Sequence, residues 1–166
     1  MRILGIETSC DETALAVVSD RDGHFVIEQN VLASQANTHS KYGGVVPEVA
    51  AREHAALLFP LLHQMNIARD GKGIDAIAVT AGPGLVPALR VGVELGKTLA
   101  WAWHKPLVAV NHLEGHIYSV WLTEFKAPFH LRMASVDQPK LQRRLVHLRM
   151  ASVDQPKLQR RLVGAC

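Results

Sequence analysis

The spacing of hydrophobic and polar residues predicts that the chain begins with three β-strands. Residues 2–8, 13–19 and 24–32 are short runs dominated by apolar side chains. The turn-forming residues Asp20-Arg21-Asp22-Gly23 separate the second run from the third. Because both connections are short, we expect the three strands to form an antiparallel meander.

The rest of the pattern alternates between helix and strand. Helices are predicted over residues 48–65 and about 85–103, strands over 74–80 and 106–110, and a last helix from about residue 112. Pro47 suits the first turn of a helix, whereas Pro60 lies inside the first predicted helix and should kink it there. This order predicts an α/β fold in which helices pack on a mixed sheet.

Composition narrows the class of protein. The chain has 166 residues, of which 48% are hydrophobic and 20% charged, as in an ordinary globular domain. Its two cysteines, Cys10 and Cys166, do not suggest a disulfide scaffold and fit a reducing compartment. The first apolar run is too short for a signal peptide, and the longest one, residues 85–103, contains Arg90, Glu94 and Lys97. We therefore expect a cytoplasmic protein with no membrane segment.

The charge divides the chain into two parts. Residues 1–129 contain more acidic than basic side chains, whereas residues 130–166 contain eight basic and two acidic ones and account for the net charge of +3. Residues 130–146 are repeated without change at 147–163. We expect a domain over 1–129 and a basic tail over 130–166 that is non-native or poorly ordered and binds phosphate only weakly.

The most distinctive polar residues are His112 and His116. On a helix they lie on one face, one turn apart, where two imidazoles can bind a divalent transition metal. Glu114 lies roughly 200° around the helix from His112, so this is not the zinc-protease arrangement H-E-x-x-H. The alternative, that the histidines only cap the helix or face solvent, stays open from the residues alone.

Two connections between the predicted elements could contact phosphate. The short link 9–12, Ser-Cys-Asp-Glu, combines a hydroxyl group with two acids, although a solvated hairpin tip would look the same. The turn 81–84, Ala-Gly-Pro-Gly, leads from a strand into a helix, as is common where a helix N-terminus meets a phosphate or an adenylate. Neither the dinucleotide fingerprint nor the Walker A loop is complete.

Four ordered motifs then indicate a family: Ile-Glu-Thr-Ser-Cys-Asp-Glu-Thr at 6–13, Tyr-Gly-Gly-Val-Val-Pro-Glu at 42–48, Ala-Gly-Pro-Gly-Leu at 81–85 and Val-Asn-His-Leu-Glu-Gly-His at 110–116. Over residues 1–129 the chain resembles the N-terminal lobe of the TsaD family. The resemblance implies one lobe of the two-lobed actin/Hsp70-like (ASKHA) ATPase architecture, with the second lobe missing.

The resemblance also implies an activity, which is transfer of a threonylcarbamoyl group from threonylcarbamoyl-adenylate to the adenosine next to the anticodon of tRNA. It implies metal ligands (His112, His116; iron or zinc), catalytic acids (Asp11, Glu12) and residues that face substrate or nucleotide (Ser9, Gly82, Gly84, Asn111). Expected partners are tRNA and TsaB-like and TsaE-like proteins.

The sequence departs from the family after residue 129. The third metal ligand of the family, an aspartate of the second lobe, has no counterpart here, so we expect this polypeptide to bind metal poorly and to transfer nothing by itself. Two alternatives are a non-catalytic paralogue that binds a partner and a metalloendopeptidase. The two histidines argue against the first, and the position of Glu114 argues against the second.

Overall fold

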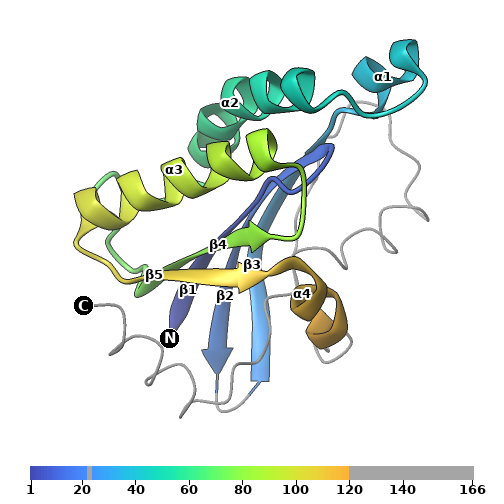
Figure 1. Ribbon diagram of the computed structural model, residues 1–166. Coiled ribbons are helices and arrows are strands. Elements are labelled where there is room, and N and C mark those ends of the chain that lie inside the picture. The colour runs from blue at the N-terminus through green and yellow to red at the C-terminus, as the bar shows by residue number, and fades with distance from the viewer. Residues whose placement is uncertain (22–23, 120–166) are drawn as a thin grey trace.

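The protein is described by a computed structural model that covers residues 1–21 and 24–119 (Figure 1). Its elements in chain order are β1 (Arg2–Glu7), β2 (Glu12–Arg21), β3 (His24–Ser34), α1 (Ala36–His39), the 3₁₀ helix η1 (Ser40–Tyr42), α2 (Pro47–Gln64), β4 (Ala76–Gly82), α3 (Val86–Trp103), β5 (Leu107–Asn111) and α4 (His112–Tyr118). The two long helices, α2 and α3, lie side by side on one face of a five-stranded sheet (Figure 1). The predicted α/β class is confirmed.

The sheet is mixed, and its strand order is β3-β2-β1-β4-β5. Strands β1, β2 and β3 pair antiparallel, which confirms the predicted meander, whereas β4 pairs parallel with both β1 and β5. Each parallel pair needs a crossover, and α2 and α3 provide the two crossovers. The carboxyl ends of β1, β4 and β5 therefore meet at one edge of the sheet.

A single large core holds these strand ends in place. Leu4, Leu15 and Ile77 come from three neighbouring strands and are fully buried. Leu58 of α2 and Leu95 of α3 pack against them from the helical layer. Burying a leucine or isoleucine side chain contributes roughly 1.5–3 kcal/mol, so this layer fixes the positions from which the edge residues project.

Several sequence expectations can be compared directly with the structure. Helices α1 and η1 were not predicted, because four and three residues are too few to show a helical period. Helix α2 runs without interruption from Pro47 past Pro60 to Gln64. The basic repeat, and with it the proposed division at residue 129, lies outside the described residues. Within the described residues, no helix has the length and hydrophobicity that a membrane crossing requires.

A chain of hydrogen bonds connects the loop before α2 to the β1–β2 turn. Each residue along it donates to the next, from Val46 to the Cys10 carbonyl. The Val46 amide donates to His39 Nδ1 (3.4 Å), and His39 Nε2 bonds the Gln35 side-chain oxygen (3.0 Å). The Gln35 amide nitrogen bonds His54 Nδ1 (3.2 Å), and His54 Nε2 bonds the Cys10 carbonyl oxygen (3.1 Å). Because the carbonyl can only accept, Nε2 of His54 carries the proton and its Nδ1 accepts.

His54 is a structural residue. Its side chain is completely buried, and the Thr13 hydroxyl lies 2.7 Å from Nδ1. Burial lowers the pKa of His54 below its ordinary value of 6.5, although the bond to the Cys10 carbonyl opposes this shift. The neutral ring therefore ties α2 to the turn that carries Ser9, Asp11 and Glu12.

This environment predicts an acid-sensitive fold. Just below pH 6.5 the unfolded chain binds a proton at His54 that the folded chain does not, so the stability due to the neutral ring is present above that pH and is lost as the pH falls. The midpoint of thermal unfolding should fall between about pH 7.5 and about pH 5.5, and H54Q should show a smaller fall. The matched control H63Q, which changes an exposed histidine of the same helix, should retain the full decrease.

Candidate functional site

The carboxyl ends of the three parallel strands bring the predicted site residues together. Ser9 follows β1, Gly82 and Gly84 lie between β4 and α3, and Asn111 ends β5. His112 and His116 follow directly on α4, and Asp11 and Glu12 lie where β2 begins beside β1. In open α/β sheets this edge is where ligands commonly bind.

Asn111 positions the helix that carries the histidines. It is the N-cap of α4, and its side-chain oxygen accepts hydrogen bonds from the amides of Leu113 (2.9 Å) and Glu114 (3.3 Å). Such a cap satisfies amides that the first turn of a helix leaves without partners. The structure thus gives the Asn111 oxygen a definite structural task, and the contact with substrate that the resemblance implies stays a prediction.

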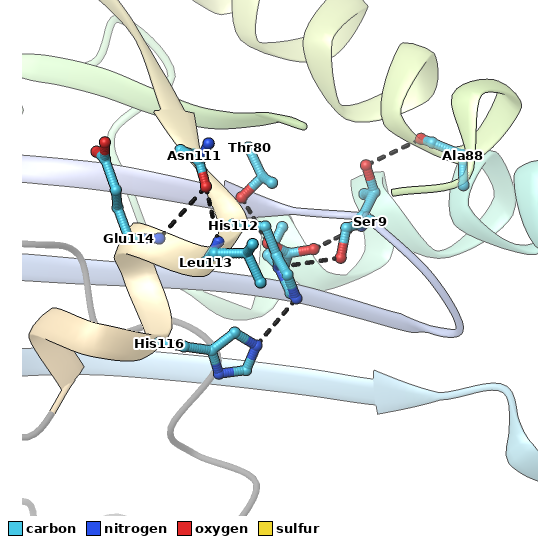
Figure 2. Close-up of polar contacts among 10 residues, drawn as sticks. Ser9, Thr80, Ala88, Asn111, His112, Leu113, Glu114 and His116 are labelled. Atoms are coloured by element: carbon cyan, nitrogen blue, oxygen red, sulfur yellow. Dashed lines mark hydrogen bonds and ion pairs between the residues drawn. The ribbon is translucent and has the colours of Figure 1, made fainter. Parts of the chain in front are cut away.

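The two histidines meet as the helical spacing predicted. Nε2 of His116 lies 3.0 Å from Nε2 of His112, and the rings pack edge to face with centroids 4.5 Å apart (Figure 2). Two imidazole nitrogens that each bind one ion at about 2.1 Å are separated by about 3.0–3.4 Å, for bond angles between a right angle and a tetrahedral one. The spacing of the pair therefore fits a single metal ion.

The carboxylate that supports this pair, Glu7, was not among the predicted site residues. Glu7, the last residue of β1, is 4% exposed and lies behind His112, with Oε2 3.4 Å from His112 Nδ1. Its Oε1 accepts the Ser9 amide at 2.5 Å, and its Oε2 accepts the Thr80 hydroxyl at 2.5 Å. An acidic residue at the end of an apolar strand was the signal that could have drawn attention to it.

Charge and burial shift the pKa values of Glu7, His112 and His116 in different directions. Burial alone would raise the pKa of the Glu7 carboxyl, but hydrogen bonds from His112, Ser9 and Thr80 together outweigh burial and lower it. The bond to Glu7 raises the pKa of His112. Burial, and then the neighbouring His112, lower the pKa of His116. The ring nearer the surface therefore favours the neutral form that metal binding requires.

The β4–α3 turn packs directly against the residue after β1. The Leu85 amide donates to the Ser9 carbonyl oxygen at 2.8 Å. A Cβ atom on Gly84 would lie 2.6 Å from that same oxygen and 2.9 Å from the Ser9 Cβ, so only glycine fits. The Ser9 hydroxyl in turn lies 3.2 Å from His112 Nδ1 (Figure 2). The two expected phosphate-facing segments are thus parts of one contiguous surface.

The two acids expected to be catalytic lie on the neighbouring turn. Asp11 and Glu12 are both partly exposed, and the Asp11 carbonyl oxygen accepts the Gln35 amide at 2.9 Å. Burial, and then the nearby Asp11, raise the pKa of the Cys10 thiol, which disfavours a nucleophilic thiolate at this turn. Glu7 and Ser9 are the neighbours that contact His112 Nδ1, at 3.4 Å and 3.2 Å.

Glu114 lies on the far side of α4 from the imidazoles, as the helical geometry predicted (Figure 2). A carboxylate in that position cannot reach a water molecule bound between His112 and His116, so the endopeptidase alternative loses its general base. Among residues 1–21 and 24–119, no group of three or more His, Cys, Asp or Glu side chains could hold a metal ion.

Comparison with known proteins assigns the chain to a family. A family model described as TsaD, tRNA N6-adenosine threonylcarbamoyltransferase, matches residues 26–135. The chain belongs to the TsaD family. Two TsaD relatives carry the name tRNA N6-adenosine threonylcarbamoyltransferase. The one from Thermomicrobium roseum is 58% identical over 126 residues, and the one from an Anaeromyxobacter species is 52% identical over 132 residues.

The match covers only part of the length of the TsaD relatives. It covers 74% and 78% of this chain but only 33% and 38% of those two proteins, so the chain spans about a third of the length of the curated relatives that it matches. Among solved structures, YeaZ from Pseudomonas aeruginosa aligns with a TM-score of 0.48 at 20% identity, over 72% of this chain and 49% of YeaZ. The TsaD assignment confirms the family and the N-terminal lobe expected from the motifs.

Proposed function

We propose that this chain supplies the histidine-bearing lobe of a tRNA-modifying transferase, which moves a threonylcarbamoyl group from threonylcarbamoyl-adenylate to the adenosine next to the anticodon. The observation that carries the proposal is the imidazole pair of His112 and His116, with Nε2 atoms 3.0 Å apart, at the edge where three parallel strands end. This arrangement occurs in a chain of the TsaD family.

The same pair would hold one divalent ion, iron or zinc, together with an aspartate from a second lobe. Bound there, the ion would polarise the carbamoyl group of the donor as a Lewis acid. The fit rests on the nitrogen spacing and on the carboxylate behind His112, which orients the ring in the way that carboxylates commonly orient metal-binding histidines.

The remaining residues of the edge would position the donor and accept a proton. The turn containing Gly82 and Gly84 leads into the N-terminus of α3, where backbone amides favour an anionic phosphate. The N6 amine of adenine attacks the carbamoyl carbon, the bond from that carbon to the phosphate oxygen breaks, and AMP leaves with the electron pair. We assign Asp11 or Glu12 as the carboxylate that accepts the amine proton.

The proposed partners follow from this reaction. The chain would act on tRNA in the cytoplasm, together with TsaB-like and TsaE-like proteins and the second lobe. A paralogue that only binds a partner would not need two imidazoles with facing nitrogens, and we therefore prefer the catalytic role.

A chimera tests the proposal. Residues 1–129 of this chain are joined to the part of the Thermomicrobium roseum relative that follows the matched region, and both the chimera and the 166-residue chain are incubated with tRNA and threonylcarbamoyl-adenylate. Mass spectrometry of digested tRNA should detect threonylcarbamoyladenosine with the chimera and none with the chain alone. A folded, metal-loaded chimera that leaves tRNA unmodified would contradict the proposal.

A further inference from the structure

Glu7, the last residue of β1, contacts groups at the ends of β1, β4 and β5, at the sheet edge that carries the candidate site. Its carboxylate bonds the Ser9 amide after β1, the Thr80 hydroxyl of β4 and the His112 ring after β5. These partners are 2, 73 and 105 residues away in the sequence. The group is 4% exposed, and burying a carboxylate is costly unless each of its oxygens is bonded.

The hydrogen bonds determine the protonation of the carboxylate. An amide and a hydroxyl group donate to its two oxygens, and an ionised carboxylate is an acceptor only. A histidine nitrogen that faces such an oxygen must therefore carry a proton. The Ser9 hydroxyl, 3.2 Å from the same Nδ1, can accept as well as donate and so is compatible with this assignment.

The position of that proton decides which nitrogen of His112 is available. A neutral imidazole carries one proton, and its other nitrogen has a free lone pair. With the proton on Nδ1, the lone pair lies on Nε2, which is the nitrogen that faces His116. With the proton on Nε2, that position could not bind a metal.

We propose that Glu7 is a positioning residue that keeps the His112 proton on Nδ1 and so leaves Nε2 available to a divalent metal. The proposal rests on the metal site of the proposed function. It adds to that site a residue on the Nδ1 side of the His112 ring, away from the nitrogen that faces His116.

The variant E7Q separates this role from simple packing. The amide is nearly the same size as the carboxylate, and its oxygen can still accept the Ser9 amide. Its NH₂ group would then face His112 Nδ1 and donate to it, which moves the ring proton to Nε2. If Glu7 merely filled space, E7Q would leave the His112 proton on Nδ1. If Glu7 is a positioning residue, E7Q moves that proton to Nε2.

The experiment uses the full 166-residue chain, Ni²⁺ as the probe and two measurements. Nitrogen NMR should find the His112 proton on Nδ1 in the native chain and on Nε2 in E7Q. Calorimetric titration should show that the component of Ni²⁺ binding that H112A removes is weakened about 10–100-fold in E7Q. E114Q, which removes a carboxylate from the far side of α4, should bind Ni²⁺ as the native chain does.

The possible failures are distinguishable. If H112A leaves Ni²⁺ binding unchanged, the metal site fails and the role of Glu7 fails with it. If H112A removes Ni²⁺ binding but E7Q binds Ni²⁺ as tightly as the native chain, the positioning role of Glu7 is excluded and the metal site stands. A proton on Nε2 of His112 in the native chain would overturn the proposal without any variant, so the test does not depend on the folding of E7Q.

Discussion

Replacing His112 by alanine is expected to abolish threonylcarbamoyl transfer by the chimera. The pair of facing Nε2 atoms, 3.0 Å apart, becomes a single imidazole, which cannot retain the ion without its neighbour. A Lewis-acid metal contributes several kcal/mol to transition-state stabilisation, and every 1.36 kcal/mol is a factor of ten in rate, so the rate should fall at least about a thousandfold. The measurement is the initial rate of tRNA modification together with the metal content of the purified variant.

Matched variants test whether the loss of transfer activity is specific to the imidazole pair. H116A should cost about as much as H112A, and the double variant should cost little more, because residues that act as one unit are not additive. H63A removes an exposed histidine from α2 and should leave both the rate and the metal content unchanged. An H112A chimera that kept its metal and its rate would remove the imidazole pair from the reaction.

Replacing Gly84 by alanine is expected to destabilise the fold at the sheet edge where β1, β4 and β5 end. The new Cβ would lie 2.6 Å from the Ser9 carbonyl oxygen and 2.9 Å from the Ser9 Cβ, and both belong to a segment that cannot rotate out of the way. Overpacking of this kind costs about 1–3 kcal/mol, and the hydrogen bond from the Leu85 amide to the same oxygen would weaken as well. Urea unfolding measures the loss.

Gly44 provides the control for the substitution at Gly84. A Cβ atom there would meet nothing within 4 Å, so G44A should change the free energy of unfolding by no more than about 0.5 kcal/mol. Because Ser9 also contacts His112, G84A should weaken Ni²⁺ binding through displacement of Ser9, whereas G44A should not. Equal stability of the two variants would mean that the Ser9 segment moves more freely than its contacts indicate.

The sequence predicted the structure well wherever residues of one kind recur with the period of a strand or a helix. Alternation and helical spacing gave the strands and the long helices, and the separation of four residues gave the facing imidazoles. The sequence was uninformative where contacts are long-range. Nothing near Glu7 in the sequence points to Thr80 or His112, which lie 73 and 105 residues away, and a single acid in an apolar strand has no period.

Asn111 shows a different limit. The family resemblance implies that Asn111 faces substrate, and the structure shows in addition that its side-chain oxygen caps α4. The sequence contained the cap signal too, since asparagine is among the preferred N-cap residues. The positions of the following amides show the capping role, and the contact with substrate stays a prediction.

The brevity of α4 has a thermodynamic consequence. A helix of seven residues is far shorter than the about 12–15 that an isolated helix needs in water, so its order depends on what holds its ends. The Asn111 cap stabilises the first turn of α4, whereas His116 lies in its last turn. An ion bound by both His112 and His116 would connect these two turns. Under the proposed function, loading of the ion and ordering of this segment are therefore linked, and amide hydrogen exchange at its last turn should slow as the site fills.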